Sequence, residues 1–208
     1  MPASNSSTSQ IQSHSSRETL AYYENQAKEF ASQTKDAPMG DLQKQFLGYL
    51  KPGSRILDFG CGSGRDAIAF SKASFRTDAL DGCQAFCEQL EGRISGTILH
   101  QAFADFAAEE IYDGIWACAS LLHLEKQDLL PVLRALFQAL KPGGIFYCSF
   151  KEGDYEGMRN GRYFLDLQEE TLVPLLKAAG FEILEVFESE DCRKDRTLTW
   201  INAICKKP

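Results

Sequence analysis

The residues best suited to chemistry in this chain surround a turn that contains three glycines. In the segment RILDFGCGSGRD, Gly60, Gly62 and Gly64 follow an apolar run and precede an amphipathic one. A glycine turn between a strand and a helix lets the backbone approach a ligand and directs helix N–H groups at it. Asp58 precedes the first glycine by two residues, and its carboxylate would repel a pyrophosphate but suit a ligand that carries an ammonium group.

Nicotinamide dinucleotides are one ligand class for such a turn. Their fingerprint, GxGxxG/A, needs a small residue in its sixth position so that the helix packs closely on the strand. Counting from Gly60 places Arg65 there, and the spacing is GxGxG. The pattern therefore disfavours the dinucleotide. A turn that only connects a strand to a helix stays an alternative.

Two further acids are expected at strand ends. Asp81 ends the second strand about twenty residues beyond the first glycine, the distance at which a carboxylate accepts the hydroxyls of a ribose. Asp105, in the segment FADF, follows the third strand and could bind an adenine amino group, with Phe106 beside the ring. Each acid alone could be a solvated carboxylate. Three acids at one edge of a sheet instead indicate a nucleotide-like ligand.

The elements that must position these residues alternate along the chain. Short apolar runs predict strands and the amphipathic segments between them predict helices, a pattern typical of a mostly parallel sheet covered on both faces. The expected strands are 55–59, 76–80, 97–101, 112–118 and 145–150, and the expected helices are 65–72, 84–90 and 128–140.

The C-terminal region has a different pattern. The segments FEILEVFE and TLTWINAICKK predict two strands with no helix between them, so these strands must be antiparallel. The predicted fold is therefore one α/β, Rossmann-like, doubly wound and mostly parallel sheet of seven strands that ends in an antiparallel hairpin. Pro174 interrupts the helix before this hairpin, and that helix either begins near Thr171 or is kinked.

The N-terminal region divides into a polar tail and two helices. Residues 1–16 are rich in serine and nearly without large apolar side chains, so we expect a disordered tail ahead of one domain over 17–208. Apolar residues at helical spacing predict helices in RETLAYYENQAKEFASQT and DLQKQFLGYL.

Composition narrows the class of protein further. The 208 residues are 44% hydrophobic and 25% charged, which is ordinary for a soluble globular protein. A net charge of −7 argues against a protein that binds nucleic acid through its overall field. The seven cysteines form no CxxC pair, so we expect reduced thiols, a cytoplasmic location and no metal. No apolar run approaches the ~18 residues of a membrane helix or forms a signal peptide, so no membrane association is expected.

From about Leu20 onward the chain resembles a class I S-adenosylmethionine-dependent methyltransferase. ILDFGCGSGRD resembles that family's first motif, TDALDGC its second, FADF its third, and YDGIWACASLLHL its fourth strand and following loop. LKPGGIFYCSF resembles the helix-to-strand turn that follows, and the C-terminal hairpin matches the family's last two strands. The resemblance implies S-adenosylmethionine as the cofactor and S-adenosylhomocysteine as its product.

The resemblance also implies the cofactor contacts. Asp58 would lie near the methionine ammonium, Asp81 on the ribose and Cys83 beside the adenine. For Tyr23, core packing and a contact with the cofactor carboxylate are the two alternatives. The implied cofactor-binding residues are Tyr23, Asp58, Gly60, Cys61, Gly62, Gly64, Arg65, Asp81, Gly82, Cys83, Asp105 and Phe106, with Ala119 and Ser120 under the sulfonium.

Methyl transfer is an in-line displacement, so the protein needs mainly to align the nucleophile and exclude water. His123 is the candidate catalytic base, although a histidine in this loop could equally cap a helix or pack on the cofactor. Lys151 and Arg162, from the long charged segment after the fifth strand, would bind an anionic acceptor, and a solvated connecting loop is the alternative.

These observations predict a methyltransferase that acts on a small molecule. The acidic surface favours such an acceptor over nucleic acid or protein. Two other functions stay open. An NAD(P)-dependent Rossmann oxidoreductase would need a small residue in place of Arg65, and a regulatory protein would bind S-adenosylmethionine without turnover.

Overall fold

The computed structural model describes residues 13–192 and 197–208. Its strands are β1 (Arg55–Phe59), β2 (Arg76–Asp81), β3 (Ile98–His100), β4 (Tyr112–Ala117), β5 (Leu140–Lys151), β6 (Glu156–Arg159), β7 (Arg162–Leu165), β8 (Glu182–Glu190) and β9 (Thr199–Lys206). Its α-helices are α1 (His14–Thr34), α2 (Gly40–Leu47), α3 (Arg65–Lys72), α4 (Gln84–Gln89), α5 (Lys126–Ala139) and α6 (Glu169–Ala179). Two short 3-10 helices are η1 (Phe103–Asp105) and η2 (Leu121–His123).

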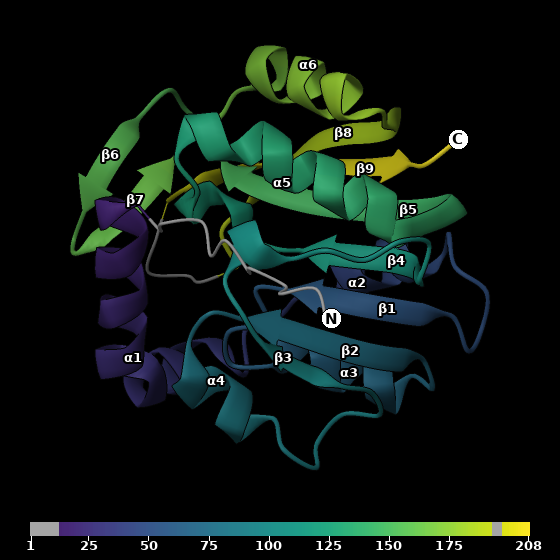
Figure 1. The fold of residues 1–208 in the computed structure, drawn as a ribbon, viewed down its shortest axis with the longest axis horizontal. Coiled ribbons are helices and arrows are strands. Elements are labelled where there is room, and N and C mark those ends of the chain that lie inside the picture. Colours follow the sequence, from purple (N-terminus) through teal and green to yellow (C-terminus); the bar gives the residue numbers. More distant parts are fainter. Residues whose placement is uncertain (1–12, 193–196) are drawn as a thin grey trace, which may run out of the picture.

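Seven of these strands form one sheet in the order β3-β2-β1-β4-β5-β9-β8 (Figure 1). Strands β3, β2, β1, β4 and β5 pair in parallel, whereas β9 pairs antiparallel with both β5 and β8. The predicted fold class is therefore confirmed, including the antiparallel C-terminal hairpin. The strand order reverses between β1 and β4, and in open α/β sheets ligands bind at the carboxyl ends of the strands beside such a reversal.

The segment after β5 differs from the predicted loop. It contains a second, two-stranded sheet made of β6 and β7, which pair antiparallel around the two-residue turn Asn160–Gly161. Both turn residues are left-handed, with φ of 53° and 76°. An Asn-Gly pair is the strongest short-range signal for such a hairpin, so the sequence contained the signal that the prediction of a loop missed.

The helix that contains Pro174 also differs from the prediction. It begins at Glu169, two residues before the predicted start near Thr171. The reason is a capping box, in which the side chain of Gln168 caps the first turn while Thr171 Oγ1 accepts the backbone N–H of Gln168 at 3.1 Å. Pro174 therefore lies in the second turn of α6.

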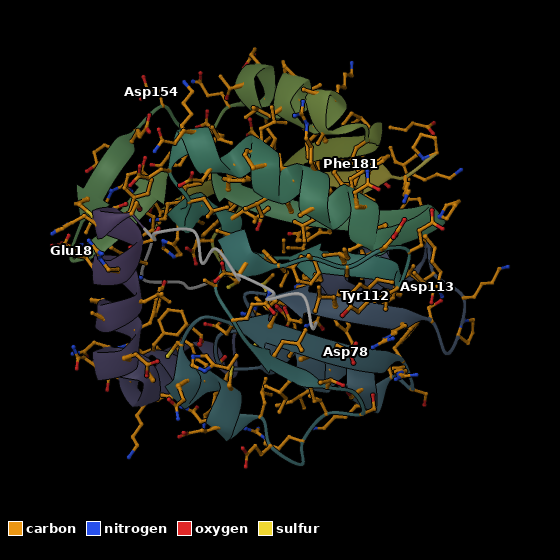
Figure 2. The ribbon with its side chains drawn as sticks, viewed as in Figure 1. Glu18, Asp78, Tyr112, Asp113, Asp154 and Phe181 are labelled. Carbon is orange, nitrogen blue, oxygen red and sulfur yellow. The ribbon has the colours of Figure 1, made fainter. Side chains whose placement is uncertain are left out.

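Helices cover both faces of the large sheet (Figure 1). On one face α5 and α6 pack over the sheet, and Phe181, labelled in Figure 2, stacks on Phe146 at 4.8 Å and meets the edge of Phe137 at 5.2 Å. On the other face Phe46 of α2 and Phe70 of α3 contact Trp116 of β4. These two aromatic layers fix the strands whose ends form the site.

Helix α1 stands at the carboxyl edge of the parallel strands, beside the β6–β7 hairpin (Figure 1). Thr19 Oγ1 accepts the backbone N–H of Tyr163 at 2.9 Å, and the Glu24 carboxylate accepts the N–H groups of Gln84 and Ala85 at the start of α4. The helix is thus attached to the hairpin and to α4.

Helix α1 begins inside the range predicted as tail. Ser13 is its N-cap, and the Ser13 hydroxyl accepts the N–H of Ser16 at 3.2 Å. Ser15 adds a hydrogen bond to Glu125. A serine at this position satisfies N–H groups that a helix start leaves unpaired, so 13–16 form the start of α1. Residues 1–12 of the predicted tail lie outside the described residues.

Candidate active site

A cavity of about 570 Å³ opens at the carboxyl edge of the sheet beside the reversal of strand order. Strands, the glycine turn, helix α1 and the β6–β7 hairpin all contribute to its wall. The sequence-predicted residues that line it are Tyr23, Gly60, Cys61, Gly62, Arg65, Asp81, Gly82, Ala119, Ser120, His123, Lys151 and Arg162. The predicted residues outside its wall are Asp58, Gly64, Cys83, Asp105 and Phe106.

The glycine turn brings the backbone to the cavity. Gly60 has a φ of +82°, and a Cβ on it would lie 2.3 Å from the Ser120 Cβ. Gly64, with φ of +75°, is the N-cap of α3, and a Cβ there would overlap Leu90 at 2.1 Å. Only glycine fits either position. Gly64 is therefore a packing requirement behind the wall, whereas Gly60 forms part of it.

Asp81 lies at the end of β2 with its carboxylate fixed by the backbone. The N–H of Gly62 donates to Oδ2 and the N–H of Cys83 donates to Oδ1, each at 2.9 Å. Burial raises the pKa of Asp81 to about 6 even though both hydrogen bonds favour the charged form. A carboxylate oxygen has further lone pairs, and those of Asp81 face a cavity where the sequence predicts a ribose.

Asp58 is placed differently from its prediction. Its carboxyl group is buried and accepts the backbone N–H of Ala67 in α3 at 3.0 Å. Burial, and then the charge of Asp66, raise its pKa well above the usual range. Asp58 thus fixes the start of α3 behind the glycine turn, away from the cavity wall on which an ammonium group was expected.

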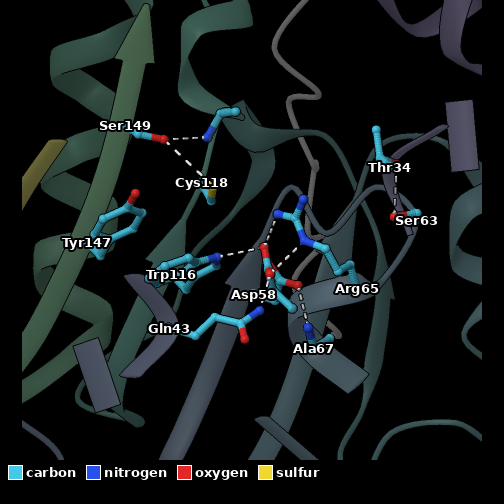
Figure 3. Close-up of polar contacts among 12 residues, drawn as sticks. Thr34, Gln43, Asp58, Ser63, Arg65, Ala67, Trp116, Cys118, Tyr147 and Ser149 are labelled. Carbon is cyan, nitrogen blue, oxygen red and sulfur yellow. Dashed lines mark hydrogen bonds and ion pairs between the residues drawn. The ribbon is translucent and has the colours of Figure 1, made fainter. Parts of the chain in front are cut away.

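Arg65 lines the cavity, and its guanidinium is held by the hydrogen bonds drawn in Figure 3. Its Nε and Nη2 donate to the two oxygens of Asp66 at 2.9 and 2.7 Å. Asp66 in turn accepts Trp116 Nε1 at 3.0 Å and Gln43 Nε2 at 2.6 Å. Because Asp66 is held from three sides, it fixes the guanidinium of Arg65, and Nη1 makes no hydrogen bond to any part of the chain that is described.

The two residues of FADF that were predicted to contact adenine, Asp105 and Phe106, do not line the cavity. Asp105 is exposed, and Phe106 is buried with its edge against Phe59 at 5.3 Å. The 3-10 turn η1 instead brings Phe103 to the wall, where it stacks on Phe59 at 4.5 Å. The spacing of the sequence could not reveal this turn. Cys83 is similarly displaced, since its side chain packs in the core with Ala27 and Phe86.

Helix α1 also supplies wall residues that were not among the predicted site residues. Leu20 covers Gly82, where a Cβ would lie 2.7 Å from the Leu20 Cδ2, and Phe30 lies 3.6 Å from the position of a Cβ on Gly62. Thr34 Oγ1 donates to Ser63 Oγ at 3.2 Å. The helical spacing of α1 predicted its apolar face, but nothing in it named the partner surface.

The turn after β4 is strained and polar. Ala119 has a φ of +52°, which is uncommon for a residue other than glycine. Its backbone N–H donates to Ser149 Oγ at 2.9 Å, which holds the turn in place. The neighbouring Ser120 Oγ is buried, lines the cavity and has no hydrogen-bond partner among the described residues. A buried polar atom is normally hydrogen-bonded, so Ser120 Oγ is available to a group that enters the cavity.

His123 is hydrogen-bonded through both ring nitrogens. Nδ1 lies 2.7 Å from the carbonyl oxygen of Tyr163, which can only accept, so Nδ1 carries the proton. Burial lowers the pKa of His123 to about 4, and the charges of Arg162 and Lys151 lower it too. The ring is therefore neutral, and its Nε2 lone pair accepts the Tyr23 hydroxyl at 2.8 Å. Burial raises the pKa of Tyr23, which keeps this hydroxyl protonated.

Three cations lie around the ring of Phe164 beside this pair. Lys151 and Arg162 line the cavity, whereas Arg159, 5.0 Å from the ring centroid, pairs with Asp166 and does not line it. Lys151 Nζ is 3.7 Å from the ring centroid and the Arg162 guanidinium carbon is 5.1 Å from it. Arg162 also lies 4.6 Å from the Tyr22 ring and donates from Nη1 to Tyr23 Oη at 3.4 Å. Its Nε is buried and has no hydrogen-bond partner within 13–192 and 197–208.

The wall therefore fits the cofactor that the sequence suggested. Asp81 offers acceptor sites for a ribose, Ser120 Oγ is an unpaired buried group, and Gly60 lets a ligand approach the backbone. In the described part of the chain, no group of three or more His, Cys, Asp or Glu side chains is arranged to hold a metal ion. No described helix is both long and apolar enough to cross a membrane.

Comparison with known proteins agrees with this geometry. Residues 30–186 match the family model of the methyltransferase domain. The ubiquinone biosynthesis O-methyltransferase of Xanthomonas campestris pv. campestris is 31% identical over 105 residues, which cover 47% of this chain and 43% of that protein. The chain thus spans less than half the length of this curated relative.

Solved structures share the fold over nearly the whole chain. The 1,6-didemethyltoxoflavin-N1-methyltransferase of Burkholderia thailandensis, crystallised with 1,6-didemethyltoxoflavin and S-adenosylhomocysteine, superposes with a TM-score of 0.79 at 20% identity, over 92% of this chain and 88% of that one. The [4+2]-cyclase SpnF superposes with a TM-score of 0.73 at 18% identity, over 93% of this chain and 96% of that one. At these identities the likeness shows the fold.

Proposed function

The chain belongs to the methyltransferase domain family, and from that premise we propose that it transfers a methyl group from S-adenosylmethionine to a small-molecule acceptor. The observation that carries the proposal is the carboxylate of Asp81, fixed by the N–H groups of Gly62 and Cys83 at the cavity wall. A carboxylate so oriented is a preformed acceptor for two ribose hydroxyls.

Residues of the cofactor side, defined as Gly60, Gly62, Arg65, Asp81 and Ser120, bind and orient the cofactor in this proposal. Bound S-adenosylmethionine supplies a methyl carbon activated by its sulfonium. Asp81 accepts the ribose hydroxyls, and the guanidinium of Arg65 offers Nη1 to the methionine carboxylate. This role for Arg65 replaces the one expected of Tyr23, whose hydroxyl is engaged with His123 and Arg162.

Residues of the acceptor side, defined as Tyr23, His123, Lys151, Arg162 and Phe164, bind the acceptor. Lys151 is two residues beyond Ser149 on β5, so the two side chains share one face of the sheet, and Ser149 contacts the turn at Ala119. Two cations near that turn favour an acceptor that carries an anionic group. One relative is named for ubiquinone biosynthesis and a solved structure contains bound 1,6-didemethyltoxoflavin, and both favour a small molecule.

The proposal is tested with the purified chain in two steps. Calorimetric titration with S-adenosylhomocysteine and with NADH should give binding of the first alone, because Arg65 occupies the position where a dinucleotide needs a small residue. A panel of phenols, thiols, amines and carboxylic acids is then scored for release of S-adenosylhomocysteine. Preferential NADH binding would contradict the proposal in favour of an oxidoreductase. Cofactor binding without turnover of any acceptor would favour a regulatory protein.

The anionic acceptor is tested by Arg162→Ala. We expect a higher Michaelis constant for the acceptor and a dissociation constant for S-adenosylmethionine within about twofold of the parent, since the lost contact of ~1.5 to 3 kcal/mol is made to the acceptor alone. Arg159→Ala is the matched control, because Arg159 lies opposite Arg162 in the hairpin but pairs with Asp166 outside the cavity wall. A loss of cofactor affinity in Arg162→Ala alone would place Arg162 with the cofactor.

A further inference from the structure

Among the residues that the structure describes, the acceptor side has no group placed to remove a proton from the acceptor. His123 was the candidate base, but its protonated Nδ1 is bound to the Tyr163 carbonyl and its Nε2 accepts the Tyr23 hydroxyl. To act as a base it would have to exchange that contact for the acceptor and then carry a charge in a buried place beside Arg162 and Lys151. His123 is therefore a positioning residue for Tyr23, which it holds between itself and Arg162.

The other titratable groups near the turn at Ala119 are also engaged. Tyr23 and Tyr147 are protonated phenols, and Tyr147 donates to Asn202 at 2.8 Å. Burial raises the pKa of Cys118 to about 12, so its thiol is neutral. Asp66 accepts hydrogen bonds from three residues and Asp81 from two backbone N–H groups. None of these groups is a free base of suitable strength.

The remaining carboxylates of the wall, counted over the described residues, stand on other elements. Asp41 lies in the first turn of α2, Asp128 in the first turn of α5, Glu190 at the end of β8, and Asp191 directly after it. The charges that face His123 and Phe164 are instead the cations of β5 and β7. The side chains of Lys151 and Arg162 thus make the acceptor side electropositive, whereas the four carboxylates belong to other parts of the wall.

An electropositive site in which no described group can act as a base favours a nucleophile that is already ionised when it binds. We infer that the acceptor is an acidic small molecule which binds as its anion, and that the ionised atom is the one that is methylated. The inference rests on the proposed function. A lone pair of the anion forms the bond to the methyl carbon, the carbon–sulfur bond breaks with its electron pair left on sulfur, and no proton is transferred to the protein. Arg162 Nε, buried and unpaired among the described residues, is the donor that the anion would satisfy.

A binding experiment tests the inference without turnover. The probe is 4-nitrophenol, whose ionised form absorbs at longer wavelength, added to the protein saturated with S-adenosylhomocysteine. We expect the bound phenol to ionise at a pH lower by about one unit or more than in water, because opposite charges within ~4–6 Å lower an acid's pKa by that much. Arg162→Met and Lys151→Met should each reduce the shift. Arg134→Met, at an exposed residue of α5, should keep it. A phenol that binds protonated, or that does not bind while aniline does, would overturn the inference.

A kinetic experiment separates the inference from the proposed function. With phenols and thiophenols of graded acidity, the pH at which kcat/KM reaches its plateau should follow the acidity of the acceptor and keep its position in His123→Asn. A plateau at one pH for all acceptors would show a protein base, and turnover of neutral amines alone would show a neutral nucleophile. Either result overturns the inference but leaves methyl transfer standing. Failure to bind S-adenosylhomocysteine would overturn both.

Discussion

The two sides of the cavity are built in different ways. The cofactor side is made mostly of turns at the ends of the neighbouring strands β1, β2 and β4, and its Asp81 is held by backbone N–H groups of Gly62 and Cys83. The acceptor side is made of side chains from separate segments, with Tyr23 from α1, His123 from η2 and Arg162 from β7. A site for a ligand that many proteins share can thus be built from short motifs at strand ends. A site for a ligand particular to one protein instead depends on contacts between segments far apart in the chain.

The largest expected effect tests the backbone construction of the cofactor side. Gly60→Ala should lower the free energy of unfolding by ~1–2 kcal/mol for the left-handed backbone and by a further ~1–3 kcal/mol for overlap with Ser120. Gly53→Ala is the matched control, since Gly53 has a φ of +79° with nothing within 4 Å of its Cβ position. Urea unfolding of both variants measures the difference. Equal losses would show that Ser120 yields and that the close approach is not a constraint.

The next effect distinguishes two residues within the cofactor side. Asp81→Ala should weaken binding of both S-adenosylhomocysteine and methylthioadenosine at least tenfold, because both carry the ribose and each charge-assisted hydrogen bond is worth about 1.5–3 kcal/mol. Arg65→Gln should weaken S-adenosylhomocysteine by about tenfold or more and leave methylthioadenosine unchanged, because only the former has a carboxylate. Calorimetric titration of each variant with the two ligands measures these affinities. Parallel losses in Arg65→Gln would mean that it only supports the fold around Asp66.

A pH titration tests the charge of Asp81, the carboxylate of the cofactor side. The folded pKa of Asp81 is raised from 3.8 to about 6, so the ionised form that accepts ribose hydroxyls is lost as the pH falls through this value. Cofactor affinity should therefore drop by about tenfold between pH 7 and pH 5, since one proton is taken up per site. For the stability of the protein without cofactor, the pH dependence has the opposite sign. A raised carboxyl pKa stabilises the fold below about 4, and this contribution is lost as the pH rises through about 6. Asp81→Asn should remove the pH dependence of binding, and a dependence that persisted would assign it to another group.

The smallest effect concerns the start of α1, which carries Tyr23 to the acceptor side. We expect removal of 1–12 to leave the melting temperature and cofactor affinity unchanged, in keeping with the polar composition of that segment. Removal of 1–16 should cost about 1 kcal/mol more, because it deletes the N-cap Ser13. Thermal unfolding of the two truncations gives the comparison. Equal stability would show that the cap is dispensable.

The same contrast explains what the sequence could predict. Strand β1 and helix α3 have their predicted bounds, and Asp81 and Gly60 lie on the cavity wall, because alternation and glycine spacing reflect the local backbone. Asp58 and Asp105 were predicted in the cavity from their positions at strand ends, but the start of α3 and the turn η1 direct them elsewhere.

For the acceptor side, the sequence named three of the residues but not the contacts between them. His123, Lys151 and Arg162 line one cavity. The hydrogen bond between the Tyr23 hydroxyl and His123 depends on how α1 packs, which the spacing of its residues does not determine. The hairpin that carries Arg162 had its signal in Asn160–Gly161. Its position beside α1 had none, because that contact is made between residues far apart in the chain.

The position of α1 over the cofactor side has a consequence for the rate at which the product dissociates. Leu20 covers Gly82, while Glu24 ties the helix to the start of α4 and Thr19 ties it to Tyr163. We expect S-adenosylhomocysteine to leave such a site only when several of these contacts separate together, so that the opening of α1 would limit product release. Glu24→Gln should then speed product dissociation in stopped-flow measurements more than it weakens equilibrium binding.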